Sequence, residues 1–165
     1  MKLFKIPETF GPASANRMDE TSATGMQGAV AALETFYYAF NNRSVEILCA
    51  IWAKDPLAQL NNPVGGVMRG MDEISSVYNH LAGGKVSVWV ELYDIVVMDG
   101  GGMVTFMGRE RGEAQWDGAL LPLAIRTTRL FAWDEPEGAW RQFHHHGSMD
   151  EPGPLAKYQM AVRGR

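Results

Sequence analysis

Three consecutive histidines near the end of the chain are the residues whose type and spacing best suit chemistry. They lie in the segment 140–148, WRQFHHHGS, which follows a turn and is predicted to form a strand. Because successive side chains of a strand point to opposite faces, His144, His146 and Ser148 share one face. His145 is predicted to lie on the other face, with Arg141 and Phe143. We therefore expect two histidine environments rather than one cluster.

The face shared by His144 and His146 is predicted to carry acid–base chemistry. Imidazole titrates near neutral pH, so it can accept a proton as a base or donate one as an acid. We assign His146 as base or donor and His144 as its assistant, with Arg126 or Thr128 on the neighbouring strand orienting the ligand. Two alternatives stay open: the pair only satisfies buried polar groups, or the face binds a ligand without turnover.

The same two histidines would also supply two ligands to zinc or iron. A third ligand is missing at any diagnostic spacing, and Glu91, Asp94 or Glu113 would complete a site only through tertiary proximity. The glycine runs at 65–66 and 100–102 lack the strand-to-helix context of a phosphate-binding loop. We therefore predict no metal site and no cofactor.

Arg126 and Arg129 are predicted to lie on opposite faces of one strand, because strand side chains alternate. At most one of the two arginines therefore points into the cavity. A buried arginine without a counter-charge costs several kcal/mol, so an inward Arg126 requires an acidic residue or an anionic ligand beside it. The alternative is an exposed Arg126 in a surface salt bridge.

Composition restricts the class of protein. The chain has 165 residues, 46% of them hydrophobic, and a net charge of -4, which together indicate one globular domain without the basic field that nucleic acid requires. Cys49 stands among apolar residues, so we expect it to be a small, buried hydrophobic side chain. We find no export signal and no run of about 18 apolar residues. We therefore expect a cytoplasmic protein with neither nucleic acid nor membrane as partner.

Apolar periodicity predicts helices first and strands afterwards, which is an α+β order. The expected helices span 27–41, 45–52 and 71–81, and the expected strands span 57–61, 67–69, 85–98, 102–116, 120–133 and 139–148. Turn signals between the last four strands predict an antiparallel meander. We divide the chain into an N-terminal arm (1–26), a domain (27–148) and a C-terminal tail (149–165) that lies over the domain or another subunit.

Several motifs in this order resemble the SnoaL-like branch of the nuclear transport factor-like, or ketosteroid isomerase-like, superfamily. They are W-A-K-D at 52–55, N-N-P at 61–63, R-G-M-D-E-I at 69–74 and R-T-T-R-L-F at 126–131, followed by Trp140 and H-x-H-x-S at 144–148. The resemblance implies a cone, in which three N-terminal helices pack into a strongly curved, mostly antiparallel mixed sheet. A pocket is expected between the helices and the sheet.

The superfamily includes isomerases, cyclases, dehydratases and noncatalytic binding proteins, so the resemblance implies a pocket without naming one reaction. We expect a small apolar or polycyclic ligand, with proton transfer, cyclisation or dehydration of a carbonyl compound as the chemistry. The alternative is a noncatalytic ligand-binding or assembly subunit. A homodimer through the outer sheet face is also implied. The residues expected to bind the ligand are Tyr37, Trp52, Asn61, Arg126 and Thr128.

Overall fold

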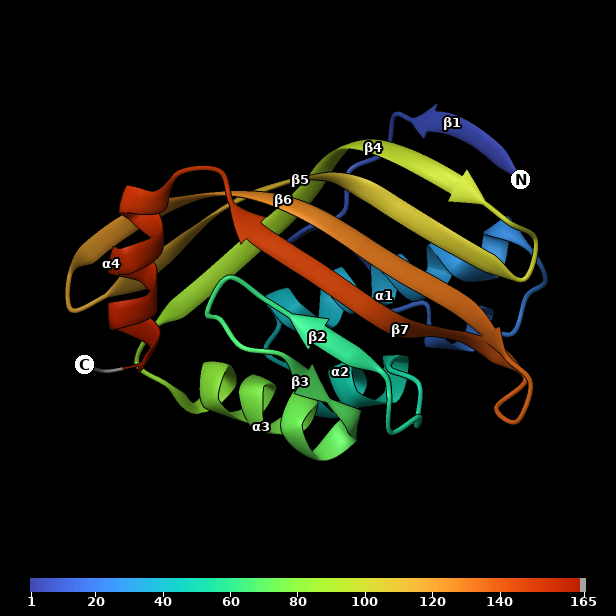
Figure 1. The fold of residues 1–165 in the computed structure, drawn as a ribbon, viewed down its shortest axis with the longest axis horizontal. Coiled ribbons are helices and arrows are strands. Elements are labelled where there is room, and N and C mark those ends of the chain that lie inside the picture. The colour runs from blue at the N-terminus through green and yellow to red at the C-terminus, as the bar shows by residue number, and fades with distance from the viewer. Residues whose placement is uncertain (164–165) are drawn as a thin grey trace.

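The computed structural model describes residues 1–163 and shows one curved sheet with helices on its concave side (Figure 1). The helices are α1 (Met26–Asn41), α2 (Val45–Ile51), α3 (Gly70–Gly83) and α4 (Pro152–Arg163), with a 3-10 turn at Met18–Glu20. The strands are β1 (Lys2–Ile6), β2 (Gln59–Asn61), β3 (Met68–Arg69), β4 (Ser87–Asp99), β5 (Met103–Trp116), β6 (Ala119–Asp134) and β7 (Ala139–Met149). The predicted α+β cone is confirmed.

Within residues 1–163 the sheet has seven strands in the order β1-β4-β5-β6-β7-β2-β3. The long strands β4 to β7 form the antiparallel meander predicted from the turn signals, and β1 and β3 also pair antiparallel to their neighbours. The exception is β2, which runs parallel to β7 and pairs with its histidine segment. The sheet is therefore mixed but mostly antiparallel.

The first helix, α1, brings the helical layer close to β7. Its buried side chains, among them Leu33, Phe36 and Tyr37, recur at helical spacing and face the sheet. Gly28 lets the two elements approach, because a Cβ at this position would come within 2.5 Å of Trp140 Cδ1. This contact fixes α1 across the interior of the cone.

The first 26 residues, predicted to be an N-terminal arm, lie against the domain. β1 adds a strand beside β4 through regular backbone pairing from Lys2 to Ile6. Phe10 is buried, and Arg17 forms an ion pair of 3.0 Å with Glu34 on α1. Backbone hydrogen bonds account for most of this order, since the β1 side chains themselves are mostly exposed. Composition alone does not predict such pairing.

The C-terminal segment forms a helix, although its sequence shows no clear period. The two prolines, Pro152 and Pro154, stand in the first turn of α4, where a missing backbone N–H removes no helical hydrogen bond. Tyr158 and Val162 follow at a spacing of four residues and are buried. None of the helices within residues 1–163 has the length and apolar character needed to cross a membrane.

Candidate ligand-binding site

A bulge in β7 brings one histidine into the cone. The register between β6 and β7 shifts once, and Phe143 is the unpaired residue. This extra residue puts Gln142 and His145 on the same, concave face, which corrects the grouping predicted from strict alternation. His145 lies opposite Arg129 of β6, and both side chains are buried.

A buried ion pair forms the polar end of the interior. Arg129 Nη2 donates to Glu110 Oε1 at 2.9 Å, with only 2% and 4% of the two side chains exposed. The Tyr37 hydroxyl donates to the same Glu110 oxygen at 2.5 Å and accepts from Arg129 Nε at 2.9 Å. Gln142 Oε1 accepts from Arg129 Nη1 at 3.1 Å, and the Phe36 ring lies 3.7 Å from the guanidinium carbon. The two charges are thus paired inside the core.

The surroundings of Arg129 and Tyr37 hold each of these two side chains in one protonation state. Burial opposes the charge on Arg129, but Tyr37 and Glu110 outweigh burial, so the pKa of Arg129 lies above its ordinary value. Burial also raises the pKa of Tyr37 well above its usual range. Arg129 is therefore a permanent cation and Tyr37 a neutral phenol, so neither is suited to exchange protons near pH 7.

His145 is the titratable group of this region with spare hydrogen-bonding capacity. Its Nε2 lies 3.1 Å from Thr127 Oγ1, whereas its Nδ1 is buried with no partner among the described residues. Burial, assisted by Arg129, holds the pKa of His145 well below its ordinary value, so the ring is neutral at pH 7. Depending on the tautomer, Nδ1 is either a bare acceptor or an N–H donor.

The polar end borders a small cavity inside the cone. Arg129, Glu110 and His145 line one side of it, and its volume is about 40 Å³. The remaining lining is mainly apolar and includes Phe36, Phe40, Leu60, Tyr78, Leu81, Val88, Val90, Ile125 and Tyr158. Such a volume accommodates water, whereas pockets for drug-sized ligands typically measure about 300–1,000 Å³. A larger ligand therefore requires the walls to move.

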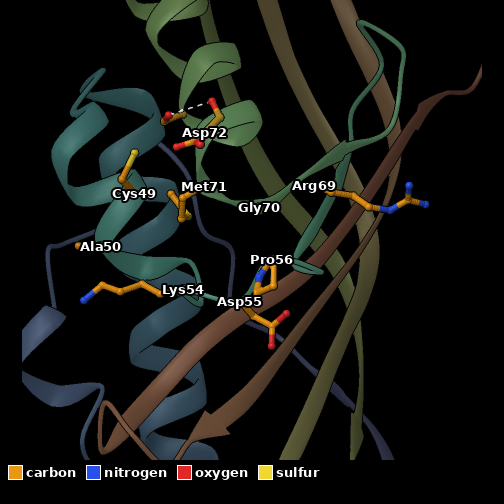
Figure 2. Close-up of a pocket in the computed structure, with 10 residues that line it drawn as sticks. Cys49, Ala50, Lys54, Asp55, Pro56, Arg69, Gly70, Met71 and Asp72 are labelled. Atoms are coloured by element: carbon orange, nitrogen blue, oxygen red, sulfur yellow. Dashed lines mark hydrogen bonds between the residues drawn. The ribbon is translucent and has the colours of Figure 1, made fainter.

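A larger hollow lies outside the cone, between α2 and the first turn of α3 (Figure 2). It is an open groove of about 810 Å³. Figure 2 shows Lys54 and Arg69 pointing in opposite directions. Lys54 pairs with Glu137 at 2.8 Å, and Arg69 donates to Gln59 at 3.0 Å. Because these charged groups do not converge on one position, the interior cavity is the better candidate.

The two histidines predicted to be catalytic lie on the outer face of the sheet. His146 is exposed, and His144 is half-buried with a pKa lowered by burial. Thr128 lies opposite His146 on the same outer face, and exposed Arg126 pairs with Asp150 at 3.2 Å. The catalytic role of His144 and His146 stays a prediction, as does ligand binding by Arg126 and Thr128. Within residues 1–163, no three histidine, cysteine or acidic side chains gather as metal ligands do.

The other predicted ligand-binding residues lie closer to the interior. Tyr37 belongs to the buried cluster, and Trp52 Nε1 donates at 3.1 Å to the hydroxyl of Tyr78, which lines the cavity. Asn61 is half-buried on β2, with an Oδ1 that finds no partner in the described part of the chain. Direct contact of these residues with a ligand stays a prediction.

Sequence reasoning missed Glu110, Arg129 and His145. A signal for the first two exists in the strand period. Every second residue of β6 from Leu121 to Phe131 is buried, and Arg129 falls in this apolar phase. Glu110 has the same phase as the buried residues of β5. A charged residue in the buried phase of a strand indicates a paired interior charge. His145 has no such signal, because its direction depends on the bulge.

Comparison with known proteins identifies the family. The model of the SnoaL-like domain matches residues 30–151, so the chain belongs to this family, as its motifs predict. The comparison with curated proteins finds none that matches.

Solved structures show the same fold. One is a putative dehydratase of the NTF2-like family from Streptomyces avermitilis, with 20% identity, a TM-score of 0.66 and coverage of 74% of this chain and 94% of that chain. A ketosteroid isomerase-like protein from Erwinia carotovora atroseptica has 20% identity, a TM-score of 0.63 and the same coverages of 74% and 94%. An NTF2-like superfamily protein from Salmonella enterica serovar Typhimurium has 17% identity and a TM-score of 0.67, covering 76% and 90%.

Proposed function

Starting from membership of the SnoaL-like family, we propose that this protein binds a small, neutral, largely apolar molecule inside the cone. The observation that carries the proposal is the unpartnered Nδ1 of His145 at a cavity whose other walls are mainly apolar. A carbonyl or hydroxyl oxygen of the ligand would satisfy this nitrogen. Because Arg129 and Glu110 already neutralise each other, a charged ligand would lack a counter-charge there.

Proton transfer is the chemistry that this site supports best. A general base must be unprotonated and near the proton that it removes, and His145 is neutral at the cavity wall. The proposed step uses the tautomer of His145 that carries its proton on Nε2, beside Thr127 Oγ1, and leaves Nδ1 bare. The C–H bond next to a ligand carbonyl breaks and the proton moves to Nδ1. The electron pair moves to the carbonyl oxygen, and the imidazolium that the same transfer creates on His145 is the counter-charge of the enolate. Binding without turnover is the alternative.

A neutral fluorescent ketone, prodan, tests the binding proposal. Its emission shifts to the blue in an apolar environment, so we expect a saturable shift on titration with the protein. His145→Gln removes the imidazole nitrogen and should weaken binding about tenfold, the effect of one lost hydrogen bond. His144→Gln, one residue away on the outer face, is the matched control and should leave the affinity unchanged. The binding proposal fails if no saturable shift occurs or if both variants have equal effects.

Exchange of α-protons with deuterated water separates catalysis from binding. With 2-tetralone as a neutral ketone, nuclear magnetic resonance should show faster loss of the α-proton signal in the presence of the protein. The acceleration should disappear in His145→Gln and persist in His144→Gln and His146→Gln. If only the outer-face variants abolish exchange, the base is His144 or His146. Saturable binding without acceleration would support the noncatalytic alternative.

We also propose a homodimer through the outer sheet face. Half-buried Met107 and Leu130 place apolar surface on this face between charged side chains. Leu130→Glu introduces a charge there and should shift the sedimentation of a dimer to that of a monomer. Sedimentation as a monomer by the unaltered protein would exclude the dimer.

A further inference from the structure

The C-terminal helix forms one wall of the interior cavity. Figure 1 shows α4 at one end of the sheet, beside the link from α3 to β4. Its Tyr158 is 4% exposed and lines the same cavity as Arg129, Glu110 and His145. A residue from the last turns of the chain thus completes a site that the rest of the domain builds.

The attachment of α4 to the domain rests on four apolar side chains and a few polar contacts. Within the described residues of α4, Tyr158 and Val162 are buried, and Leu155 and Ala161 are partly buried against the core. Gln159 Nε2 donates to Pro63 O at 3.0 Å, and the Val162 carbonyl lies 2.7 Å from His80 Nε2. Arg163 Nη2 donates to Val64 O at 2.6 Å. No ion pair within residues 1–163 joins the helix to the domain.

The chain at the start of α4 is suited to a change of direction. Asp150 N donates to Ala124 O at 2.9 Å, which ties the end of β7 to β6. Glu151 and the first two residues of α4, Pro152 and Gly153, then follow, all exposed, and a Cβ at Gly153 would meet nothing within 4 Å. Movement of α4 about this segment would leave the pairing of β7 intact.

We propose that α4 is a displaceable wall and that Tyr158 is the side chain that a bound ligand replaces. This inference rests on the proposed function. It explains how a cavity of about 40 Å³ can receive a ligand, since removing Tyr158 joins its volume to the cavity. It also narrows the ligand class: Tyr158 is a flat ring with one oxygen, so the vacated space fits a neutral aromatic or similarly flat cyclic molecule that carries an oxygen.

Prodan is a suitable probe of this wall, because it is flat, neutral and carries a ketone. In the full-length protein, Tyr158→Ala should raise the affinity for prodan about tenfold, because binding no longer requires displacement of the ring. Met160→Ala, at a position of α4 that is 61% exposed, is the matched control and should match the unaltered protein. Thermal unfolding checks that both variants are folded, and Tyr158→Leu replaces Tyr158→Ala if the latter does not fold.

Stopped-flow kinetics distinguish a moving wall from a merely larger cavity. If α4 must open first, the observed binding rate of the unaltered protein should level off at high prodan concentration. In Tyr158→Ala it should continue to rise linearly. Adding Leu81→Trp to Tyr158→Ala fills the cavity from another wall and should abolish binding, which places the probe inside the cone.

The outcomes separate the inference from the function on which it rests. If folded Tyr158→Ala binds prodan with the affinity and kinetics of the unaltered protein, the displaceable wall is wrong and the proposed function stands. If Leu81→Trp does not affect binding to Tyr158→Ala, the probe occupies the surface and the inference is overturned. If neither the unaltered protein nor Tyr158→Ala binds prodan, both proposals fall.

Discussion

The two faces of β7 place identical side chains in opposite environments. His145 points into the cone, where it is buried, neutral and hydrogen bonded to Thr127 alone. Its neighbours His144 and His146 point outward, half-buried and exposed. The difference comes from the single bulge at Phe143, not from residue type. In this fold, position relative to a bulge decides which histidine can meet an interior ligand.

The arginines of β6 repeat the same contrast. Arg129 pairs with Glu110 inside the cone, where 2% and 4% of the side chains are exposed. Arg126 pairs with Asp150 outside, where 63% and 30% are exposed. Water screens the outer pair, so its two partners lose little when separated. Inside the cone no water replaces a lost partner, so removing either Arg129 or Glu110 would leave the other as an unpaired buried charge.

Breaking the inner ion pair should have the largest effect. Glu110→Gln leaves Arg129 as an unpaired buried charge and should lower the free energy of unfolding by about 3–5 kcal/mol. Asp150→Asn breaks the outer pair and should cost about 0–1 kcal/mol. Urea unfolding followed by tryptophan fluorescence measures both. Similar losses for the two variants would contradict the contrast between the faces.

The pH dependence of stability should follow the inner histidine. The fold depresses the pKa of His145 below its ordinary value of 6.5. Below pH 6.5 the unfolded chain therefore binds a proton at His145 that the folded protein does not bind. Stability is therefore complete above this pH and falls on acidification, by about 1.4 kcal/mol per pH unit at most. At pH 5 the loss from this residue has an upper limit of about 2 kcal/mol.

Urea unfolding at pH 7.5 and pH 5 measures this loss. His145→Gln should be less sensitive to pH than the unaltered protein, whereas His146→Gln should keep the original dependence. An unchanged pH dependence in His145→Gln would mean that the fold does not depress the pKa of His145.

The smallest expected effects come from Thr127 and Thr128, two adjacent threonines on opposite faces of β6. Thr127→Val removes the hydroxyl that bonds His145 Nε2 and should cost about 1–3 kcal/mol, the penalty of an unsatisfied buried group. Thr128→Val makes the same chemical change on the outer face and should stay within about 0.5 kcal/mol. Thermal unfolding of the two variants provides the measurement. A larger loss for Thr128→Val would reverse the assignment of the faces.

Much of the fold follows from local patterns. The helical spacing of Leu33, Phe36 and Phe40 predicts α1, and the turn at 100–102 predicts the pairing of β4 with β5. The direction of His145 toward the interior depends on the bulge in β7. A bulge adds one residue without a glycine or proline to mark it, so no local pattern predicts the inward direction of His145.

The two ends of the chain show another limit of sequence prediction. β1 is stabilised mainly by backbone pairing with β4, which any exposed sequence can supply. α4 has a short apolar stripe of Leu155, Tyr158 and Val162, which follows directly after two prolines that interrupt the pattern. Both segments gain their order from the domain that they cover, so a sequence window confined to either one does not contain the cause of its structure.

The outermost strands have a consequence for aggregation. An unpaired strand edge is a template on which another chain can add a strand. β1 carries Lys2 and Lys5 along one edge, and β3 at the other edge is only two residues long, Met68–Arg69, before the chain enters α3. The long histidine strand is thereby shielded from edge-to-edge pairing. Both edges of the sheet therefore oppose its extension into a continuous ribbon of many chains.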